Sequence, residues 1–274
     1  MNLHVGTSGY SYKEWKGNFY PEDLPAKEML AYYSRRLPAV EINNTFYRLP
    51  QASMIENWRD QVPPEFRFSI KATQRITHIK RLNNCADETK YLLDTAALLG
   101  DRLGVVLFQL PPNSKKDAER LKNFLALLPD DKRAAFEFRH ESWFDDEILE
   151  ALRAKNCALV VSDTDEKPLD KVINTASWGY LRLRQMNYEE NDLAQWMKRV
   201  QEQKWNDAFV FFKHEDEGVG PKLAAKFLEL RVSEADRERG ATLTITLFGI
   251  KEPSLTVRLL KLADKLRLSE PHHR

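Results

Sequence analysis

Six apolar segments of this 274-residue chain end in polar or charged residues, which do not normally close a buried strand. They are residues 40–44 (VEINN), 68–71 (FSIK), 106–109 (VLFQ), 136–140 (FEFRH), 181–184 (LRLR) and 211–214 (FFKH). Side chains alternate between the two faces of a strand, so Glu41 and Asn43 share one face while Val40 and Ile42 share the other. An apolar outer row requires helices packed on it, and a polar inner row favours a wet, shared pocket. The combination predicts a parallel β/α barrel whose strand ends form a site.

The order of predicted elements supports this architecture. Strands are predicted to begin near residues 3, 39, 67, 104, 134, 158, 179 and 209, and most intervals between them carry apolar residues at helical spacing. We therefore predict an α/β protein with a TIM-like (β/α)8 barrel over residues 1–232. The alternative, an open doubly wound sheet, usually has a glycine-rich phosphate turn after its first strand, but residues 6–10 (GTSGY) lack the GxGxxG spacing.

The last 42 residues, 233–274, do not belong to the eightfold pattern. They contain an alternating strand pattern at 242–247 and then a basic amphipathic helical pattern, so we predict a C-terminal strand–helix appendage of unknown role. Local helix signals lie within the barrel region. Ser114 with Asp117 resembles a capping box, Asp145 can cap the helix that follows it, and Gly100 is placed to end the preceding helix.

Charge and cysteine content narrow the class of protein. The chain has 42 Lys plus Arg and 41 Asp plus Glu, a net charge of +1, so no overall field attracts nucleic acid or a membrane. The two cysteines imply no disulfide framework, which fits a reducing compartment. The sequence begins with a strand pattern rather than a signal segment, and no apolar stretch reaches the roughly 18 residues that span a bilayer. We expect a cytoplasmic protein with no membrane partner, and the oligomeric state stays open.

Several segments together resemble the YecE-like family of domains of unknown function. The matching segments are residues 6–10 (GTSGY), 15–21 (WKGNFYP), 40–47 (VEINNTFY), Lys71 with 77–78 (TH), 109–112 (QLPP) and 137–143 (EFRHESW). The resemblance covers roughly residues 3–230 and implies a TIM-like barrel related in shape to xylose isomerase and endonuclease IV barrels. It implies no particular reaction. Members of the family commonly end the last barrel strand with paired asparagines, whereas this chain has Lys213 followed by His214.

The strand ends supply candidate catalytic groups. In such barrels the residues at the carboxyl ends of the strands are the functional ones. Glu137 and Glu41 are the candidate general bases, with Glu137 favoured because it shares a strand face with Arg139. Arg139 and Arg182 are candidate clamps for an anion, since a guanidinium suits phosphate or carboxylate. Lys71 can bind an anion as a point charge, or act as a base or Schiff-base amine if it is desolvated.

Further candidates for substrate binding lie at the same end of the barrel. Amide side chains could hold the carboxylates, histidines and charged groups could contact the ligand, and aromatic rings after the strands could stack on a sugar or base. Simple packing of long loops is the alternative for the aromatic residues. The candidates are Asn43, His78, Gln109, His140, Asp163, Lys213, Tyr10, Trp15 and Trp143.

Three other interpretations remain open. A divalent metal is possible, but no tight ligand motif such as HExxH occurs and the nearby cations would repel it, so we predict no metal site and leave the cofactor unknown. A basic strip at Arg75, His78, Lys80 and Arg81 could bind nucleic acid. The charged ring could also be a salt-bridge network without a catalytic task, although apolar residues are often as stabilising as buried ion pairs.

The function that these features favour is enzymatic. We expect an enzyme that acts on a polar anionic small molecule, such as a phosphorylated or acidic sugar, by carboxylate acid/base chemistry with Arg and Lys clamps. Hydrolase, lyase and isomerase are not distinguishable at this level. The alternatives are a nucleic-acid-binding or nuclease-like hydrolase and a non-catalytic ligand-binding barrel.

Overall fold

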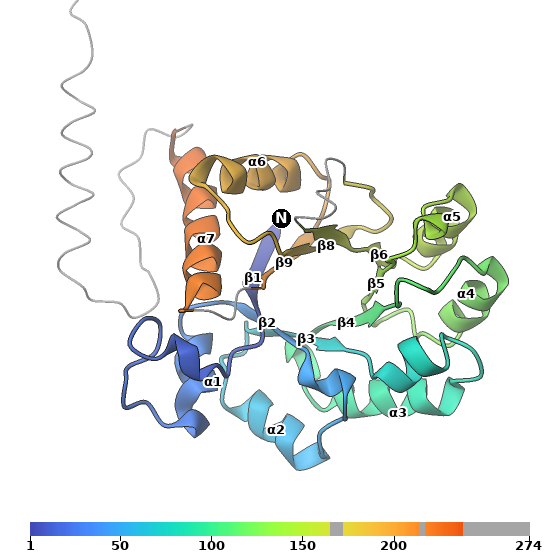
Figure 1. The fold of residues 1–274 in the computed structure, drawn as a ribbon, viewed down its shortest axis with the longest axis horizontal. Helices are drawn as coiled ribbons and strands as arrows, with labels where there is room; N and C mark the ends of the chain where they lie inside the picture. The colour runs from blue at the N-terminus through green and yellow to red at the C-terminus, as the bar shows by residue number, and fades with distance from the viewer. Residues whose placement is uncertain (165–171, 214–216, 238–274) are drawn as a thin grey trace, which may run out of the picture. The chain divides into compact units, whose positions relative to one another are not determined.

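A computed structural model describes residues 1–164, 172–213 and 217–237. Nine strands form a single parallel sheet within these residues, and Figure 1 shows them as a ring with the helices outside it. Their bounds are β1 Asn2–Ser8, β2 Ala39–Ile42, β3 Arg67–Lys71, β4 Leu103–Gln109, β5 Ala134–Glu137, β6 Ala158–Leu159, β7 Val161–Asp163, β8 Trp178–Leu183 and β9 Asp207–Phe212.

The strand order is β6-β5-β4-β3-β2-β1-β9-β8-β7, with parallel pairing at every step. Strands β6 and β7 are successive pieces of one sequence segment, separated only by Val160, whose backbone N–H donates to Phe136 O of β5 at 2.9 Å. The two edges of the sheet therefore belong to the same segment, and the sheet is a nearly closed barrel. The predicted TIM-like α/β fold is confirmed.

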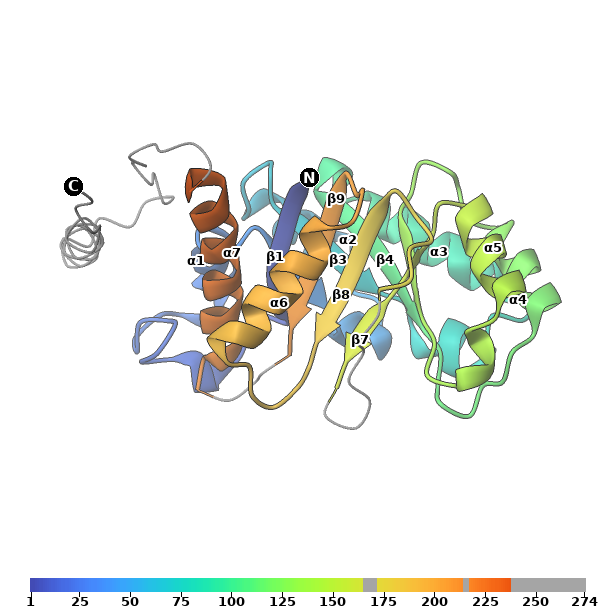
Figure 2. The same cartoon turned by 90° about the horizontal axis from the view of Figure 1, so that it is seen from above.

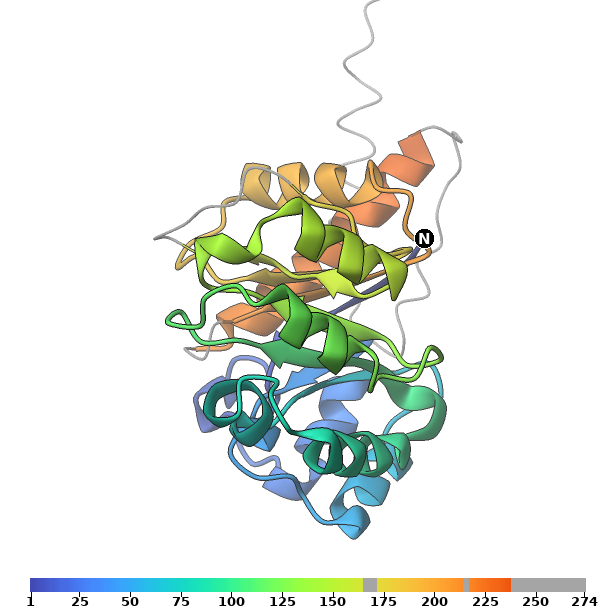
Figure 3. The same cartoon turned by 90° about the vertical axis from the view of Figure 1, so that its right-hand side faces the viewer.

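In the described part of the chain, every strand except β6 and β7 is followed by a helix before the next strand begins. Figure 2 shows β1, β9 and β8 tilted side by side, with α6 in front of them and α7 beside β1, and Figure 3 shows α4 beside α5. The α-helices are α1 Met29–Ser34, α2 Ala52–Asp60, α3 Ala86–Ala97, α4 Ala118–Leu125, α5 Asp146–Ala154, α6 Glu190–Gln201 and α7 Val219–Arg237. Single turns are η1 Lys13–Trp15, η2 Ala26–Glu28, η3 Asn44–Phe46, η4 Arg75–Ile79, η5 Gly100–Arg102 and η6 Glu141–Trp143.

Alternation along the strands produces two separate apolar clusters. The larger lies between the strands and the helices and contains Val40 and Ile42 of β2, as the sequence pattern predicts. The smaller fills the inside of the barrel and is built mainly from alanines, valines and aromatic rings. Its bulkiest members are Trp178, Tyr180, Phe209 and Phe211. These rings leave the barrel interior packed below the strand ends, so a site at this face must lie at the mouth.

Below the aromatic layer, the amino-terminal end of the barrel is closed by a small polar cluster. Asp207 accepts from His4 Nε2 at 3.0 Å and from Arg133 NH2 at 2.6 Å. His4 stacks on Phe209, with the ring centroids 4.6 Å apart. Burial lowers the pKa of His4 despite its bond to Asp207. Because this face of a β/α barrel serves stability, we regard the cluster as a structural plug.

Strand β1 approaches β2 closely at Gly6. A Cβ atom at Gly6 would lie 1.8 Å from the carbonyl oxygen of Ala39, so no larger residue fits there without movement of the backbone. The Tyr33 hydroxyl ties the two strands together, because it donates to Ala39 O at 2.9 Å and accepts from the Thr7 backbone N–H at 2.9 Å.

Of the predicted helix-start signals, one is confirmed and one is wrong. Asp145 caps α5, where its carboxylate accepts from Glu147 N, and this prediction is confirmed. The expected capping box at Ser114 and Asp117 is wrong in register. Asp117 itself is the N-cap of α4 and accepts from Arg120 N at 2.9 Å. The predicted appendage motifs, from residue 242 onward, lie outside the described residues, so the division at residue 232 stays a prediction. No helix in the described ranges is both long and apolar enough to cross a bilayer.

Candidate functional site at the carboxyl ends of the strands

An ion triad spans the barrel mouth. The Arg182 guanidinium of β8 lies between two carboxylates from distant strands, with NH2 at 2.8 Å from Glu41 Oε1 of β2 and NH1 at 2.5 Å from Glu137 Oε2 of β5. All three side chains are at most 2% exposed. The three residues come from separate strands, where Glu41 pairs with Ser8 and Ser69, Glu137 with Gln109 and Arg182 with Phe211. The predicted convergence of these three residues is thus present.

The Glu41 carboxylate accepts hydrogen bonds from four residues. Besides Arg182, its carboxylate accepts from Ser8 Oγ at 2.8 Å, Asn43 Nδ2 at 2.9 Å and Tyr180 OH at 2.7 Å. Burial by itself raises the pKa of Glu41, but the charge of Arg182 and these hydrogen bonds lower it overall. A carboxylate with four donors is a fixed anion rather than an exchanger of protons. The geometry therefore favours a positioning role for Glu41 over the predicted role of general base.

Glu137 is held less completely. Its Oε1 lies 3.3 Å from Arg139 Nε and 3.8 Å from Arg184 NH1. Burial opposes ionisation, yet the positive charges of Arg182, Arg184 and Arg139 outweigh it and bring the pKa of Glu137 down to about 2. Glu137 is consequently ionised at neutral pH. Two of the three arginines contact it loosely, so a bound anion could draw them away.

Lys71 differs from every other charged residue of the mouth. It is half-buried at the end of β3, and its Nζ lies 4.5 Å from the centroid of the Phe46 ring. Within the described ranges its ammonium group makes no hydrogen bond or ion pair. Burial lowers the pKa of Lys71 to about 8, helped by the charge of Arg182 and partly opposed by Glu41 and Glu137. Lys71 is therefore the charged group of the mouth closest to losing its proton at neutral pH.

The mouth has more positive than negative charge. Four cations face two carboxylates, an excess of two (4 − 2) among the described strand-end residues that interact there. Several buried polar atoms also have no hydrogen-bond partner in the described structure. They are Arg182 Nε, Arg184 Nε, Gln109 Nε2 and Asn43 Oδ1. Three of these four atoms are donors, and buried donors are normally satisfied, so the arrangement suits the oxygens of an anion.

His78 stands at the rim, in the single π-helical turn η4. Its ring meets the Phe46 ring edge-on with the centroids 4.8 Å apart, and Nδ1 lies 2.9 Å from Thr77 Oγ1. Burial lowers the pKa of His78, and the charges of Lys71 and Arg139 lower it further, so the imidazole is neutral at neutral pH. Arg139 and Lys213 are exposed at the same rim. All three therefore lie where a ligand could reach them.

Asp163 does not face the mouth, and its predicted place in the site is wrong. Asp163 pairs in register with the outward-facing Leu183, whereas Ser162 pairs with Arg182. The Asp163 carboxylate accepts hydrogen bonds from three residues of the outer layer. They are Gln185 Nε2 at 2.8 Å, Tyr188 OH at 2.9 Å and Trp196 Nε1 at 3.2 Å. It anchors the segment that leads into α6.

The predicted aromatic platforms are packing residues. Trp15 is fully buried, and Trp143 stacks on Phe138 at 4.5 Å between centroids while its Nε1 donates to Ser114 O. The half-buried Tyr10 packs on the outer core. His140 accepts from Ser142 N at 3.2 Å and begins η6. The aromatic ring that the structure brings to Lys71 and His78 is that of Phe46.

Five residues of the mouth were missed as candidates. Strand parity places Ser8, Ser69, Tyr180 and Arg184 on the inner face, so the signal that identified Glu41 and Arg182 could have found them. The Tyr180 hydroxyl lies 2.6 Å from Ser69 Oγ and donates a hydrogen bond to Glu41. The fifth residue, Phe46, lies in a short turn after β2. A turn of this length has no repeating pattern from which the direction of a side chain could be predicted.

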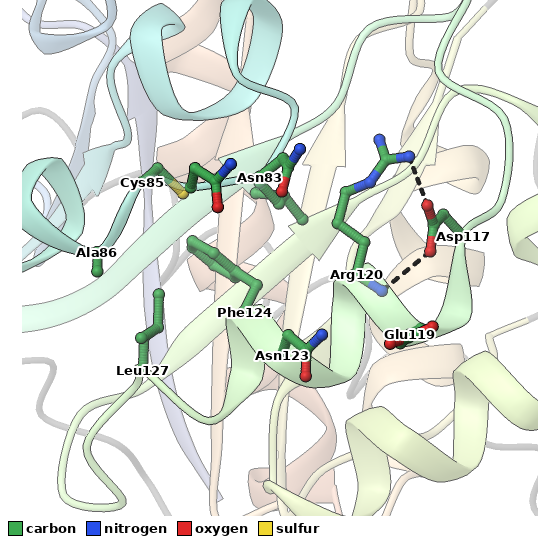
Figure 4. A pocket seen from close by; sticks show the side chains of 11 residues that line it. Asn83, Cys85, Ala86, Asp117, Glu119, Arg120, Asn123, Phe124 and Leu127 are labelled. Carbon is green, nitrogen blue, oxygen red and sulfur yellow. Dashed lines mark hydrogen bonds and ion pairs between the residues drawn. The ribbon is translucent and has the colours of Figure 1, made fainter.

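Two further hollows lie away from the ion triad. One, of about 440 Å³, lies between residues 82–86 and α4, with Phe124, Asn123 and Arg120 on one wall (Figure 4). The other, of about 740 Å³, lies between η3 and α2 and includes Arg48 and Met54. Neither is lined by a predicted site residue.

The donor set at the mouth does not match a metal centre. Among the residues described, no group of three or more His, Cys, Asp or Glu side chains could hold a metal ion. The carboxylates that could contribute are engaged by arginines, and further cations surround them. A divalent ion would have to displace these arginines, which makes an anion the better complement.

Fold and site together define a class of protein, a TIM-like β/α barrel with a buried Arg–carboxylate triad and surplus cations at its mouth. The chain belongs to the family described as "Protein of unknown function DUF72", whose match covers residues 4–243. The UPF0759 protein YunF of Bacillus subtilis (strain 168) is 26% identical over 268 residues, covering 83% of this chain and 94% of YunF. The UPF0759 protein YecE of Escherichia coli (strain K12) is 33% identical over 143 residues, covering 52% of this chain and 50% of YecE.

Solved structures of the same family share the fold. A DUF72 family protein from Thermotoga maritima is 25% identical, with a TM-score of 0.68 and coverage of 85% of this chain and 100% of that chain. A second, from Enterococcus faecalis, is 17% identical with a TM-score of 0.67, and covers 88% of this chain and 96% of its own. These likenesses support the barrel and the resemblance to the YecE-like family, and they carry no assignment of a reaction.

Proposed function

We propose that this protein is an enzyme that binds a small anionic molecule, such as a phosphorylated or acidic sugar, at the barrel mouth. The observation that supports it is the excess of positive charge beside the ion triad. Arg184 reaches Glu137 only at 3.8 Å, and Lys71 forms no ion pair within the described residues. A structural network would pair its charges, because an uncompensated buried charge is strongly destabilising. An anionic ligand supplies the missing charge and accepts from the unpartnered donors.

The arrangement divides the work among the residues. Arg139 and Arg184 bind the anionic group, because each touches Glu137 only through a long contact. Arg182 stays with its carboxylates and fixes them. When the anion engages Arg139 and Arg184, their positive charges no longer stabilise ionised Glu137, so its pKa rises and it becomes a better proton acceptor. Lys71 is the second group able to exchange a proton.

Titration with inorganic phosphate, sugar phosphates and sugar acids tests this proposal, with heat release and thermal shift as readouts. A ligand at about 100 times its dissociation constant adds about 2.7 kcal/mol to folding stability. Arg184→Gln should weaken binding by about 10- to 100-fold, since a hydrogen bond to a charged group contributes about 1.5–3 kcal/mol. Arg75→Ala is the matched control, because Arg75 belongs to η4 at the same end of the barrel but pairs with Glu88 at 2.8 Å. Equal affinity in both variants would contradict the proposal.

Nucleic acid is the less favoured ligand. The predicted basic strip is partly neutralised, because Arg75 and Lys80 share the Glu88 carboxylate, at 2.8 and 2.7 Å. The tryptophans expected to stack on bases, Trp15 and Trp143, are buried. A short oligonucleotide in the same titration decides the matter, since binding through phosphates would weaken steeply with salt.

A further inference from the structure

Lys71 combines three features that anion binding alone does not require. Its side chain points into the barrel mouth from the inner face of β3, where the neighbouring inward residue is Ser69. Its ammonium packs over the ring of Phe46 and has no anionic partner in the described chain. Fully buried lysines are almost always paired, whereas half-buried Lys71 lacks a carboxylate partner in the described residues. The position is therefore built to hold an amine that is not neutralised by a fixed counter-ion.

The charges that face Lys71 come from several elements. Arg182 and Arg184 of β8 disfavour its protonated form, while Glu41 of β2 and Glu137 of β5 favour it. Burial adds to the arginines, and the balance leaves the pKa of Lys71 at about 8 instead of 10.5. A shift of that size increases the neutral amine at neutral pH by about 300-fold. Only the neutral amine is a nucleophile.

We propose that Lys71 is the amine nucleophile of this site and forms an imine with the aldehyde or ketone group of an anionic substrate that Arg139 and Arg184 hold. The inference rests on the proposed function, and it names the substrate class more narrowly, as a carbonyl compound that carries a phosphate or carboxylate. The unpaired ammonium of Lys71 and the loosely held arginines support it, because Lys71 and Arg184 interact electrostatically at the same mouth.

The chemical step balances without an oxidant or a metal. The Lys71 nitrogen attacks the carbonyl carbon with its lone pair, and the carbonyl π electrons move to oxygen. The nitrogen then forms the C=N double bond as the carbon–oxygen bond breaks. Both amine hydrogens leave with that oxygen as one water molecule. A proton taken up from solvent gives the iminium ion, whose positive charge faces Glu41 and Glu137, the carboxylates that already act on Lys71.

Pyridoxal 5′-phosphate is a suitable probe because it carries both an aldehyde and a phosphate. The full-length protein is treated with it, reduced with borohydride and mapped by peptide mass spectrometry. We expect one dominant adduct, on the peptide that contains Lys71, and a labelling rate that rises with pH to a midpoint near 8. Lys71→Met should remove this adduct. Lys80→Met is the matched control, since Lys80 lies at the end of η4 and pairs with Glu88. It should change nothing.

Two comparisons separate this proposal from the proposed function. Pyridoxal without its phosphate should label Lys71 at least about 10-fold more slowly, and Arg184→Gln should slow the phosphorylated probe by a similar factor. If inorganic phosphate stabilises the protein but Lys71 is labelled no faster than exposed lysines, the imine proposal is overturned and anion binding stands. If Lys71 is labelled equally by both probes, anion binding fails instead. Thermal melting of Lys71→Met confirms that the variant is folded.

Discussion

Replacing Glu137 by glutamine tests whether the ion triad is ionised as its geometry indicates. The pKa of Glu137 is about 2 in the folded protein, against 4.5 for an unperturbed glutamate. A folded-state pKa below the unfolded one means that the unfolded chain binds the extra proton as the pH falls. Glu137 therefore stabilises the protein above pH 4.5, and this contribution is lost as the pH falls towards 2.

The size of the effect follows from the two pKa values. The full difference of about 2.5 units corresponds to about 3.4 kcal/mol, of which about 2 kcal/mol is lost between pH 7 and pH 3. Glu137→Gln removes this pH dependence. The variant is also less stable at neutral pH by about 3–5 kcal/mol, because Arg182 loses one buried partner. We therefore expect the gap between the two proteins to narrow by about 2 kcal/mol between pH 7 and pH 3.

Urea unfolding followed by tryptophan fluorescence measures this gap. Glu88→Gln is the informative control, because the pKa of Glu88 is also about 2 but arises from surface hydrogen bonds with Lys80 and Arg75. Its pH dependence should fade at about 1 M NaCl, where the Debye length is about 3 Å, whereas that of buried Glu137 should persist. If the stability curves of wild type and Glu137→Gln run parallel from pH 7 to pH 3, the ionised triad is refuted.

Three further outcomes are expected from urea unfolding. Lys71→Met should be more stable than wild type at pH 7 by up to about 3 kcal/mol, because the folded state holds an unpaired ammonium, and the gain should vanish as the pH rises from about 8 to 10.5. Gly6→Ala should lose about 3 kcal/mol or more, since its Cβ would lie 1.8 Å from Ala39 O; a near-neutral effect would contradict the close approach. Asp163→Ala should lose about 3 kcal/mol by stranding three donors while phosphate affinity stays unchanged, and a large loss of affinity would return Asp163 to the site.

Strand parity explains how much of the site was readable from the sequence. The period of two placed Glu41, Glu137 and Arg182 on the inner face because each follows large apolar residues of the opposite face. The same rule, applied strictly to residues 158–163, assigns Asp163 to the outer face with Leu159 and Val161. Asp163 was predicted as a site residue because it is polar and ends a strand, but its register places its side chain on the outer face.

Distances across the barrel were beyond the reach of sequence reasoning. Parity gives the face on which a residue lies, yet it does not tell that Arg182 bridges two strands on other sides of the ring. Parity also does not show that Lys71 has no carboxylate partner among the described residues. That depends on the directions of the arginine guanidinium groups, which pair with the carboxylates instead. The aromatic residues after the strands show the same limit. Their position in the sequence shows at which end of the barrel they lie. It does not show that Trp15 and Trp143 are buried, because their burial depends on how the loops pack.

The ion triad is better understood as the source of an electric field than as a device for stability. Apolar side chains of similar volume stabilise an interior as well as a buried ion pair does, and the layer below the triad consists of such side chains. By pairing with Glu41 and Glu137, Arg182 offsets one of the two negative charges that could otherwise pair with Lys71. The low-dielectric aromatic layer strengthens that effect. The ion triad thus leaves the Lys71 amine at its edge without a carboxylate partner among the described residues.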